Sequence, residues 1–336
     1  MFLEAFSLFF LFSSGIKSAT VERLFYEVAI PMKISQRTRK ILSYYESDSP
    51  GVKTNLARLL SHGKLGNTGR MIILPIDQGF EHGPGRSFAM NEAAYDPEYH
   101  IKLAVDAGLS AYAAPLGMLE AVADSYAGSI PTILKMNSAN TLTIPPSGPD
   151  QAVTASVQDA LRLGCSAIGL TLYPGSPAFN DMAEEARDLA LEAKSCGLPI
   201  IIWSYPRGNM SPKGETAIDI VAYGAHMAAL LGAHIIKVKL PTEHLENPAA
   251  KEVYEKNKVS LKRLEDRVRH VVQSCFKGRR LVVFSGGEAK SIPDIQAEAL
   301  AIHQGGGNGS IIGRNCFKRP REEALLLLKG LINVYR

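Results

Sequence analysis

The chain has 336 residues, of which 46% are hydrophobic and 21% are charged, with 29 glycines and 19 prolines. This composition is typical of a folded globular protein and excludes disordered, collagen-like and low-complexity chains. The net charge of +4 comes from 37 basic and 33 acidic residues without a basic block, which argues against nucleic acid or an anionic membrane as the main partner and leaves anionic small molecules open.

The first 31 residues differ from the rest of the chain. Residues 1–15 read MFLEAFSLFFLFSSG, an apolar run interrupted by one glutamate and three serines, and no basic residue precedes Lys17. A spanning helix needs about 20 apolar residues and a secretory signal opens with basic ones, so the run predicts neither. We hypothesise that Met32 is the start of the native protein and that residues 1–31 are an over-extended reading frame or a dispensable arm. Residues 32–70 are then a polar, helical lead-in, with turns expected around residues 47–69.

Eight short apolar runs follow the lead-in. They are rich in β-branched residues and show no alternation of apolar and polar positions, which is typical of parallel strands covered on both faces. The eight predicted strands are 71–78, 110–115, 131–137, 166–173, 199–206, 234–241, 281–287 and 309–315.

Helical patterns lie between these strands, and several end in glycine, which tolerates the left-handed conformation at a helix C-terminus. The clearest are 96–108, 150–164, 181–197, 215–232 and the last helix, 322–336. Eight strand-then-helix units predict an α/β fold, a (β/α)8 TIM barrel over residues 71–336 with an N-terminal extension. A doubly wound open sheet is the alternative, but the segment PIDQGFEHGPG after the first strand lacks a dinucleotide-binding fingerprint.

Functional groups of such barrels gather at the C-terminal ends of the strands. The seventh and eighth strands end in Ser285-Gly286-Gly287 and Gly313-Arg314. Glycine loops at these two places expose backbone N–H groups to a phosphate, and an arginine adds a planar pair of donors. The two motifs together predict a phosphate site, and the alternative is a pair of turns with a surface arginine.

Lysines inside an apolar strand are a second signal. The run HIIKVKLP carries Lys237 and Lys239, and a buried lysine whose pKa is depressed supplies a neutral amine that forms a Schiff base with a carbonyl. Alternation along the strand places both lysines on the same side, so the pattern does not choose between them. A salt-bridged structural lysine is the alternative. Lys135, at the end of the third strand, is a candidate for binding a ligand anion.

The segment WSYPRG closes the fifth strand next to that lysine strand. Tyr205 is there a candidate acid and base for an adduct on the lysine, while Trp203 is either a substrate wall or a packing residue. Asp77, at the end of the first strand, is a candidate to exchange protons with the imine, or else it opens the following turn.

These motifs together resemble the archaeal-type class I fructose-bisphosphate aldolases, a family also found in bacteria. The resemblance rests on DQGFEHGP, WSYPRG, the strand lysine, SGG and GRN, and runs from about residue 55 to the C-terminus. It implies cleavage of fructose 1,6-bisphosphate to dihydroxyacetone phosphate and glyceraldehyde 3-phosphate, with neither metal nor cofactor. The imine lysine then maps onto Lys237 in GAHIIKVKLP, the acid/base onto Tyr205 beside Trp203, and the strand aspartate onto Asp77.

The resemblance also maps the phosphate loops onto Ser285, Gly286, Gly287, Gly313 and Arg314, and it implies a homo-oligomer. The residues after the lysine, 240–243, read LPTE where many relatives have a YTGD-like turn, which affects substrate contacts in that loop. Two related enzymes use the same lysine: an amino-dideoxy-heptulosonate synthase and a thiolase acting on a phosphorylated diketone. A non-catalytic sugar-phosphate-binding regulator is the alternative of another class, but it gives no reason to bury Lys237.

Cysteine and histidine usage indicates neither a disulfide framework nor a metal site. The four cysteines are far apart and form no C-x-x-C pair, and the eight histidines lack ligand spacing such as H-E-x-x-H. We therefore expect a cytoplasmic protein with free thiols at Cys165, Cys196, Cys275 and Cys316.

Overall fold

The computed structural model describes residues 34–142, 148–287 and 290–336. The hypothesis that Met32 is the true start concerns residues outside this part. Contacts within the chain divide it after Ser35, and the unit described below is Gln36–Arg336.

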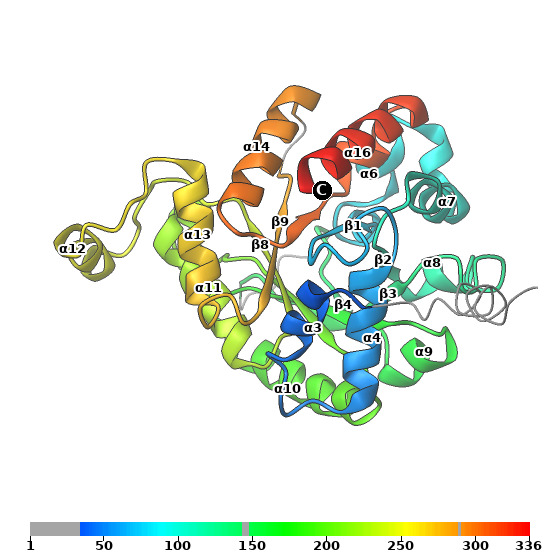
Figure 1. The fold of residues 1–336 in the computed structure, drawn as a ribbon, viewed down its shortest axis with the longest axis horizontal. Coiled ribbons are helices and arrows are strands. Elements are labelled where there is room, and N and C mark those ends of the chain that lie inside the picture. Colours follow the sequence, from blue (N-terminus) through cyan, green and yellow to red (C-terminus); the bar gives the residue numbers. More distant parts are fainter. Residues whose placement is uncertain (1–33, 143–147, 288–289) are drawn as a thin grey trace, which may run out of the picture. The chain divides into compact units, whose positions relative to one another are not determined.

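Eight parallel strands close into a barrel, which confirms the predicted TIM-barrel fold (Figure 1). Each of the eight barrel strands lies within a predicted one. The first and last strands close the ring, where Met71 pairs with Gly309. In order around the barrel the strands are β1 (Met71–Pro75), β10 (Gly309–Ile311), β9 (Leu281–Ser285), β8 (Ile235–Lys239), β7 (Ile200–Ser204), β6 (Ala167–Leu172), β3 (Thr132–Lys135) and β2 (Ala111–Pro115).

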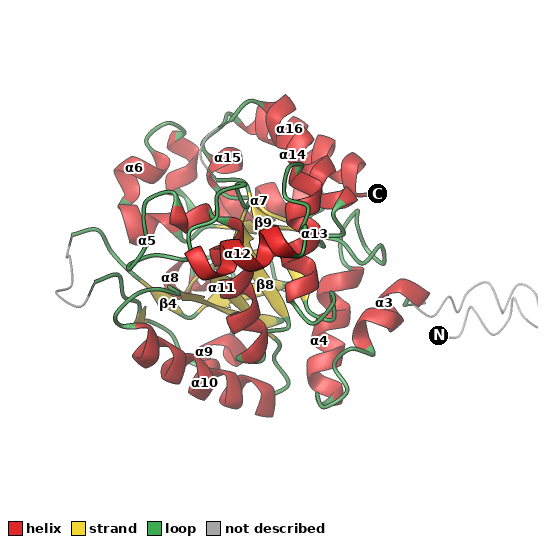
Figure 2. Cartoon of the chain, turned by 90° about the vertical axis from the view of Figure 1, so that its left-hand side faces the viewer, coloured by secondary structure: helices red, strands yellow, loops and turns green. Residues whose placement is uncertain are grey.

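Helices cover the outside of the barrel (Figure 2). The longer ones match the predicted patterns: α7 begins after Asp96, whose side chain accepts a hydrogen bond from Glu98 N, and it ends at Gly108 in the left-handed conformation. No described helix has the length and apolar character needed to cross a membrane. The covering helices are α7 (Pro97–Ala107), α8 (Leu116–Glu120), α9 (Val157–Arg162), α10 (Phe179–Ser195), α11 (Ile218–Leu230), α13 (Leu264–Ser274), α14 (Ile292–Gln304) and α16 (Arg321–Tyr335).

One helix is shorter than predicted. The expected helix 150–164 is reduced to α9, because residues 152–153 form strand β5 (Ala152–Val153), which pairs antiparallel with β4 (Asn137–Ser138). Ser156 and Asp159 cap α9 reciprocally, each side chain bonding the backbone of the other. This capping box fixes the helix start at Val157, and the apolar residues before it extend instead of coiling.

The lead-in closes the N-terminal end of the barrel. Helix α3 (Gln36–Leu42) buries Ile41, and helix α4 (Pro50–Ser61) buries Val52, Leu56 and Leu60, in one cluster with side chains of the barrel strands. Tyr45 donates a hydrogen bond of 2.6 Å to His234 O, and His234 Nε2 lies 3.1 Å from Asp48 Oδ2. The lead-in is thus part of the barrel core, although it contains many polar residues.

The helix α4 lies where turns were expected, around residues 47–69. Ser49 accepts a hydrogen bond from Val52 N and Pro50 opens the helix, both of which are helix-start signals. The apolar residues that follow are spaced at three and four positions, so the segment is amphipathic.

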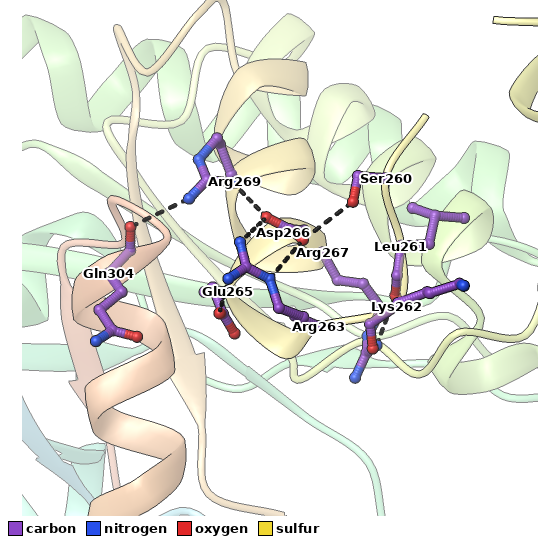
Figure 3. Close-up of polar contacts among 9 residues, drawn as sticks. All are labelled: Ser260, Leu261, Lys262, Arg263, Glu265, Asp266, Arg267, Arg269 and Gln304. Atoms are coloured by element: carbon purple, nitrogen blue, oxygen red, sulfur yellow. Dashed lines mark hydrogen bonds and ion pairs between the residues drawn. The ribbon is translucent and has the colours of Figure 1, made fainter. Parts of the chain in front are cut away.

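A long excursion, residues 240–263, connects β8 to α13. It carries helix α12 (Pro248–Lys256), which lies at the far left of Figure 1. Figure 3 shows how the return into α13 is fixed: Asp266, which is buried, accepts hydrogen bonds from Arg263 and Arg269. Arg267 donates to the carbonyls of Pro241, Leu261 and Lys262 and so joins the two ends of the excursion. The start of the excursion is therefore held in place where it borders the site described next.

Candidate active site

A cleft of about 540 Å³ opens at the C-terminal ends of the strands. Besides these strand ends, its walls include the short helices α5 (Gln78–His82) and α15 (Arg314–Phe317). The sequence-predicted residues that line it come from five different loops and strands: Asp77, Tyr205, Lys237, Lys239, Ser285, Gly286, Gly287, Gly313 and Arg314.

Lys237 is the buried amine of this cleft. Its side chain is 3% exposed, and its Nζ lies 5.2 Å from the ring centroids of both Trp203 and Tyr205. Burial lowers the pKa of Lys237 to about 8, and the charge of Arg314 acts in the same direction, against the opposing charges of Asp77 and Glu81. A minor fraction of this amine, much larger than for a lysine with the ordinary pKa, is neutral near physiological pH and able to attack a carbonyl.

Lys239 faces the same cleft, but its side chain forms an ion pair with a carboxylate. Its Nζ lies 2.5 Å from Glu215 Oε2, and a quarter of its side chain is exposed. Its ammonium is therefore engaged by a carboxylate, whereas the amine of Lys237 is not ion-paired within the described residues. The structure thus distinguishes two lysines that alternation along the strand left equivalent.

Tyr205 and Asp77 stand beside the amine. Burial raises the pKa of Tyr205 well above its usual range and the charge of Asp77 raises it further, while a hydrogen bond with Ser285 and the charge of Arg314 oppose this shift. The phenol is therefore a proton donor at neutral pH. Asp77 precedes α5, yet its side chain makes no hydrogen bond to the helix N-terminus, so it is not used as a cap.

The glycine loops form the next part of the wall, because β9 pairs directly with β8. Arg314 donates a hydrogen bond of 3.3 Å to Gly287 O, which joins the loop after β9 to the loop after β10. Gly313 passes close to the first strand, since a Cβ at this position would lie 2.7 Å from Pro75 O. A larger residue would push the β10 loop away from the cleft.

The other cations on the cleft walls are paired with carboxylates: Arg207 Nη1 lies 2.9 Å from Glu81 Oε1, and Lys290 pairs with Glu298. Within the described part of the chain, no carboxylate lies within ion-pair distance of Arg314. Its charge is available to a ligand, and the neighbouring glycine loops let an anion approach the backbone.

Two candidate substrate contacts, Lys135 and Trp203, the latter expected as either a substrate wall or a packing residue, are not among the residues that line the cleft. Trp203 is fully buried in the barrel core, over Gly169, and Lys135 is 3% exposed with its Nζ bonded to Asn137. Neither lines the cleft. Both end-of-strand positions were read from the sequence correctly, but the depth of a side chain inside the barrel depends on the register between strands.

Glu81, His82 and Arg207 are among the cleft-wall residues that sequence reasoning missed. Arg207 bridges Glu81 and the hydroxyl of Tyr173, at 2.9 and 3.2 Å. All three were within the quoted segments DQGFEHGP and WSYPRG, so the motifs marked the place although not the residues. Among the described residues no group of three or more His, Cys, Asp or Glu side chains could hold a metal ion.

Comparisons with known proteins agree with this geometry. The sequence profile of the DeoC/LacD family aldolases matches residues 71–319. A Chlamydia muridarum protein named probable fructose-bisphosphate aldolase class 1 is 34% identical over 304 residues, 87% of each chain. The fructose-bisphosphate aldolase class 1 of Thermoproteus tenax is 35% identical over 264 residues, 78% of this chain and 88% of the relative.

A solved structure of an archaeal fructose-1,6-bisphosphate aldolase has its catalytic lysine covalently bound to the carbinolamine intermediate of the substrate. It superposes with a TM-score of 0.69 at 31% identity, over 85% of this chain and all of that one. A second structure, of reaction intermediates of the Schiff-base-forming fructose-1,6-bisphosphate aldolase, gives a TM-score of 0.70 with the same identity and coverage.

Proposed function

The chain belongs to the DeoC/LacD family of aldolases, and from this premise we propose that it cleaves fructose 1,6-bisphosphate to dihydroxyacetone phosphate and glyceraldehyde 3-phosphate. Its relatives are Schiff-base class I aldolases, and Lys237 is the proposed imine lysine.

One observation carries the proposal: a buried amine with a depressed pKa lines the same cleft as a cation without a carboxylate partner among the described residues. Lys237 supplies the amine and Arg314 the cation. A phosphorylated ketone suits both groups, because its phosphate binds the cation and its carbonyl meets the amine. A binding protein without catalysis gains nothing from the cost of burying Lys237.

The first half of the cycle forms the iminium. Neutral Lys237 Nζ attacks C2 of the open-chain sugar, and the nitrogen's proton passes to the former carbonyl oxygen to give a carbinolamine. Tyr205, which is protonated in the resting cleft, gives its proton to the departing hydroxyl, which leaves as water. The products are a protonated imine and a phenolate next to it.

The second half breaks the carbon–carbon bond. The Tyr205 phenolate takes the proton of the C4 hydroxyl, the C3–C4 electron pair moves into the iminium, and glyceraldehyde 3-phosphate leaves. Tyr205 then protonates C3 of the enamine, and water hydrolyses the iminium to release dihydroxyacetone phosphate and neutral Lys237, while the proton lost from that water returns to the Tyr205 phenolate. Asp77 stabilises the cationic nitrogen, since its charge acts on Lys237 in the structure.

The test combines an assay with a trap. Aldolase activity on fructose 1,6-bisphosphate, coupled to reduction of the released dihydroxyacetone phosphate, should be unaffected by a metal chelator. Borohydride added with dihydroxyacetone phosphate should leave one reduced adduct on Lys237, located by peptide mass mapping. Lys239→Met is the matched control, because it removes the neighbouring lysine and should keep the adduct. An unmodified Lys237, or activity lost with chelator, would refute the proposal.

A further inference from the structure

The loops that follow β7 and β8 are joined to each other at the cleft. We define the β7 loop as residues 205–217 and the β8 loop as residues 240–247, the first part of the excursion. Thr242 N donates a hydrogen bond of 2.7 Å to Thr216 O, and the Thr242 hydroxyl donates to the same oxygen at 3.1 Å. Both threonines line the cleft. The two loops therefore form one continuous part of its wall.

Glu246, in the β8 loop, binds the β7 loop through both of its carboxylate oxygens. Oε1 accepts a hydrogen bond of 2.7 Å from Ser211 N, and Oε2 accepts one of 2.7 Å from the Ser211 hydroxyl. His244 Nε2 lies 2.8 Å from the same Oε2. These hydrogen bonds lower the pKa of Glu246 to about 2, so the side chain is a carboxylate at neutral pH. Gly214 leaves room for it, since a Cβ there would lie 2.8 Å from Glu246 Cδ.

The β8 loop is itself held by the helices that cover the barrel. Asp219, buried in the first turn of α11, accepts hydrogen bonds from Glu246 N at 3.1 Å and from Asn247 N at 2.8 Å. Arg267 of α13, drawn in Figure 3, donates to Pro241 O at 2.8 Å. Both ends of the β8 loop are thus fixed to the outer layer, and Glu246 joins the β7 loop to this fixed segment.

The order of the strands gives the cleft two sides. β9 and β10, whose loops carry the glycines and Arg314, lie on one side of β8, and β7 lies on the other. In the proposed cycle the phosphate of the ketone half binds at Arg314, and the C4 hydroxyl meets Tyr205, directly after β7. The aldehyde half of the sugar, C4 to C6, then extends along the side that the β7 and β8 loops form.

We propose that Glu246 is a positioning residue for the aldehyde half of the substrate: by binding Ser211, it holds the two threonines of the wall against the bound glyceraldehyde 3-phosphate. This inference rests on the proposed function. It gives the segment that follows the LPTE sequence a role in substrate selection. Formation of the imine at Lys237 does not depend on this contact, because the ketone half lies on the other side of the cleft.

The experiment measures the two halves of the reaction separately, on the full chain. For the ketone half, the initial rate of borohydride trapping of dihydroxyacetone phosphate on Lys237 is followed by mass spectrometry. For the aldehyde half, kcat and KM for glyceraldehyde 3-phosphate are measured in the condensation direction at saturating dihydroxyacetone phosphate. The variants are Glu246→Ala and Ser211→Ala. Glu252→Ala, at an exposed position of α12 in the same excursion, is the matched control.

We expect Glu246→Ala to raise the KM for glyceraldehyde 3-phosphate about three- to tenfold, because a displaced wall loses its alignment with the aldehyde. kcat should change little, since the lost contacts are made in the ground state and in the transition state alike. Ser211→Ala keeps the bond from Ser211 N and should raise KM by a smaller factor. The double variant should resemble Glu246→Ala, because both changes remove the same contact. The trapping rate should stay at the wild-type value in all variants, and Glu252→Ala should change neither quantity.

An unchanged KM in Glu246→Ala would overturn the inference. A trapping rate that falls by the same factor as kcat/KM would also overturn it, because a general loss of structure affects both halves equally. If Glu246→Ala does not fold, as judged by far-UV circular dichroism, Glu246→Gln takes its place; its neutral amide binds Ser211 more weakly, so KM should rise in the same direction. Absence of any adduct on wild-type Lys237 would instead refute the proposed function, so the two failures are distinguishable.

Discussion

Replacing Lys237 by methionine should abolish aldolase activity and, at neutral pH, stabilise the protein. The lysine is 3% exposed and burial lowers its pKa from the ordinary value of 10.5 to about 8. Methionine has a similar length and no charge to desolvate, so the variant is relieved of that cost.

The sign and size follow from proton linkage. Between pH 8 and 10.5 the unfolded chain holds a proton on this lysine that the folded chain has lost, so the wild type gains stability as pH rises through this window. Below pH 8 both states are protonated and the full cost is present. The lowering of the Lys237 pKa corresponds to about 3 kcal/mol. With allowance for imperfect packing of methionine, we expect the free energy of unfolding of Lys237→Met to exceed that of the wild type by about 1–3 kcal/mol at pH 7.

Urea unfolding of the wild type and Lys237→Met at pH 7 and at pH 10.5 measures this difference. The variant should be more stable at pH 7, and its advantage should be nearly gone at pH 10.5. Lys256→Met, at an exposed position, should show no advantage at either pH. The reasoning is refuted if Lys237→Met is no more stable than the wild type at pH 7, or if its advantage is the same at both pH values.

Three further outcomes are expected. Tyr205→Phe should turn over fructose 1,6-bisphosphate about 10²–10⁴-fold more slowly and should also form the trapped adduct on Lys237 more slowly, because the donor of the proton to the departing hydroxyl is lost; unchanged rates of both would contradict its role. Arg314→Met should reduce kcat/KM for fructose 1,6-bisphosphate about 10- to 100-fold, the value of a charged hydrogen bond. The same variant should lose little on a substrate that lacks the phosphate it binds, and a uniform loss would exclude phosphate binding. Leu56→Ala should lower the unfolding free energy by about 3–5 kcal/mol in denaturant titrations while leaving kcat unchanged at low temperature, because its cavity lies at the far end of the barrel.

The order of the strands could be predicted well because a parallel barrel strand has one simple signature, a short apolar run without alternation. The same simplicity limits the prediction. Lys237 and Lys239 are two residues apart, so they point to the same side of the strand. Only Glu215, on a different loop, makes one of them an ion-paired lysine and leaves the other a buried amine. Pairings between distant segments carry no local signal.

Depth inside the barrel was equally hidden from the sequence. Lys135 and Trp203 lie at strand ends that we expected to meet the substrate, yet both lie beneath the cleft. Trp203 has its position because Gly169, on the neighbouring strand, has no side chain. The bounds of α9 and the presence of α4 were not predicted for a related reason. Capping residues fix where each helix begins, but the apolar side chains of each helix pack against segments distant in the sequence, and the sequence pattern does not show those contacts.

The closure of the ring by β1 and β10 has a consequence for synthesis of the protein. Met71 cannot pair with Gly309 until the last strand has left the ribosome, and Asn308 Nδ2 also bonds Gly69 O across the same seam. The nascent chain must therefore hold seven strands with an open edge on β1, in an arrangement whose final contacts are distant in sequence and slow to form. A premature stop before residue 309 would leave that edge exposed, so we expect such truncated chains to aggregate rather than to form a smaller barrel.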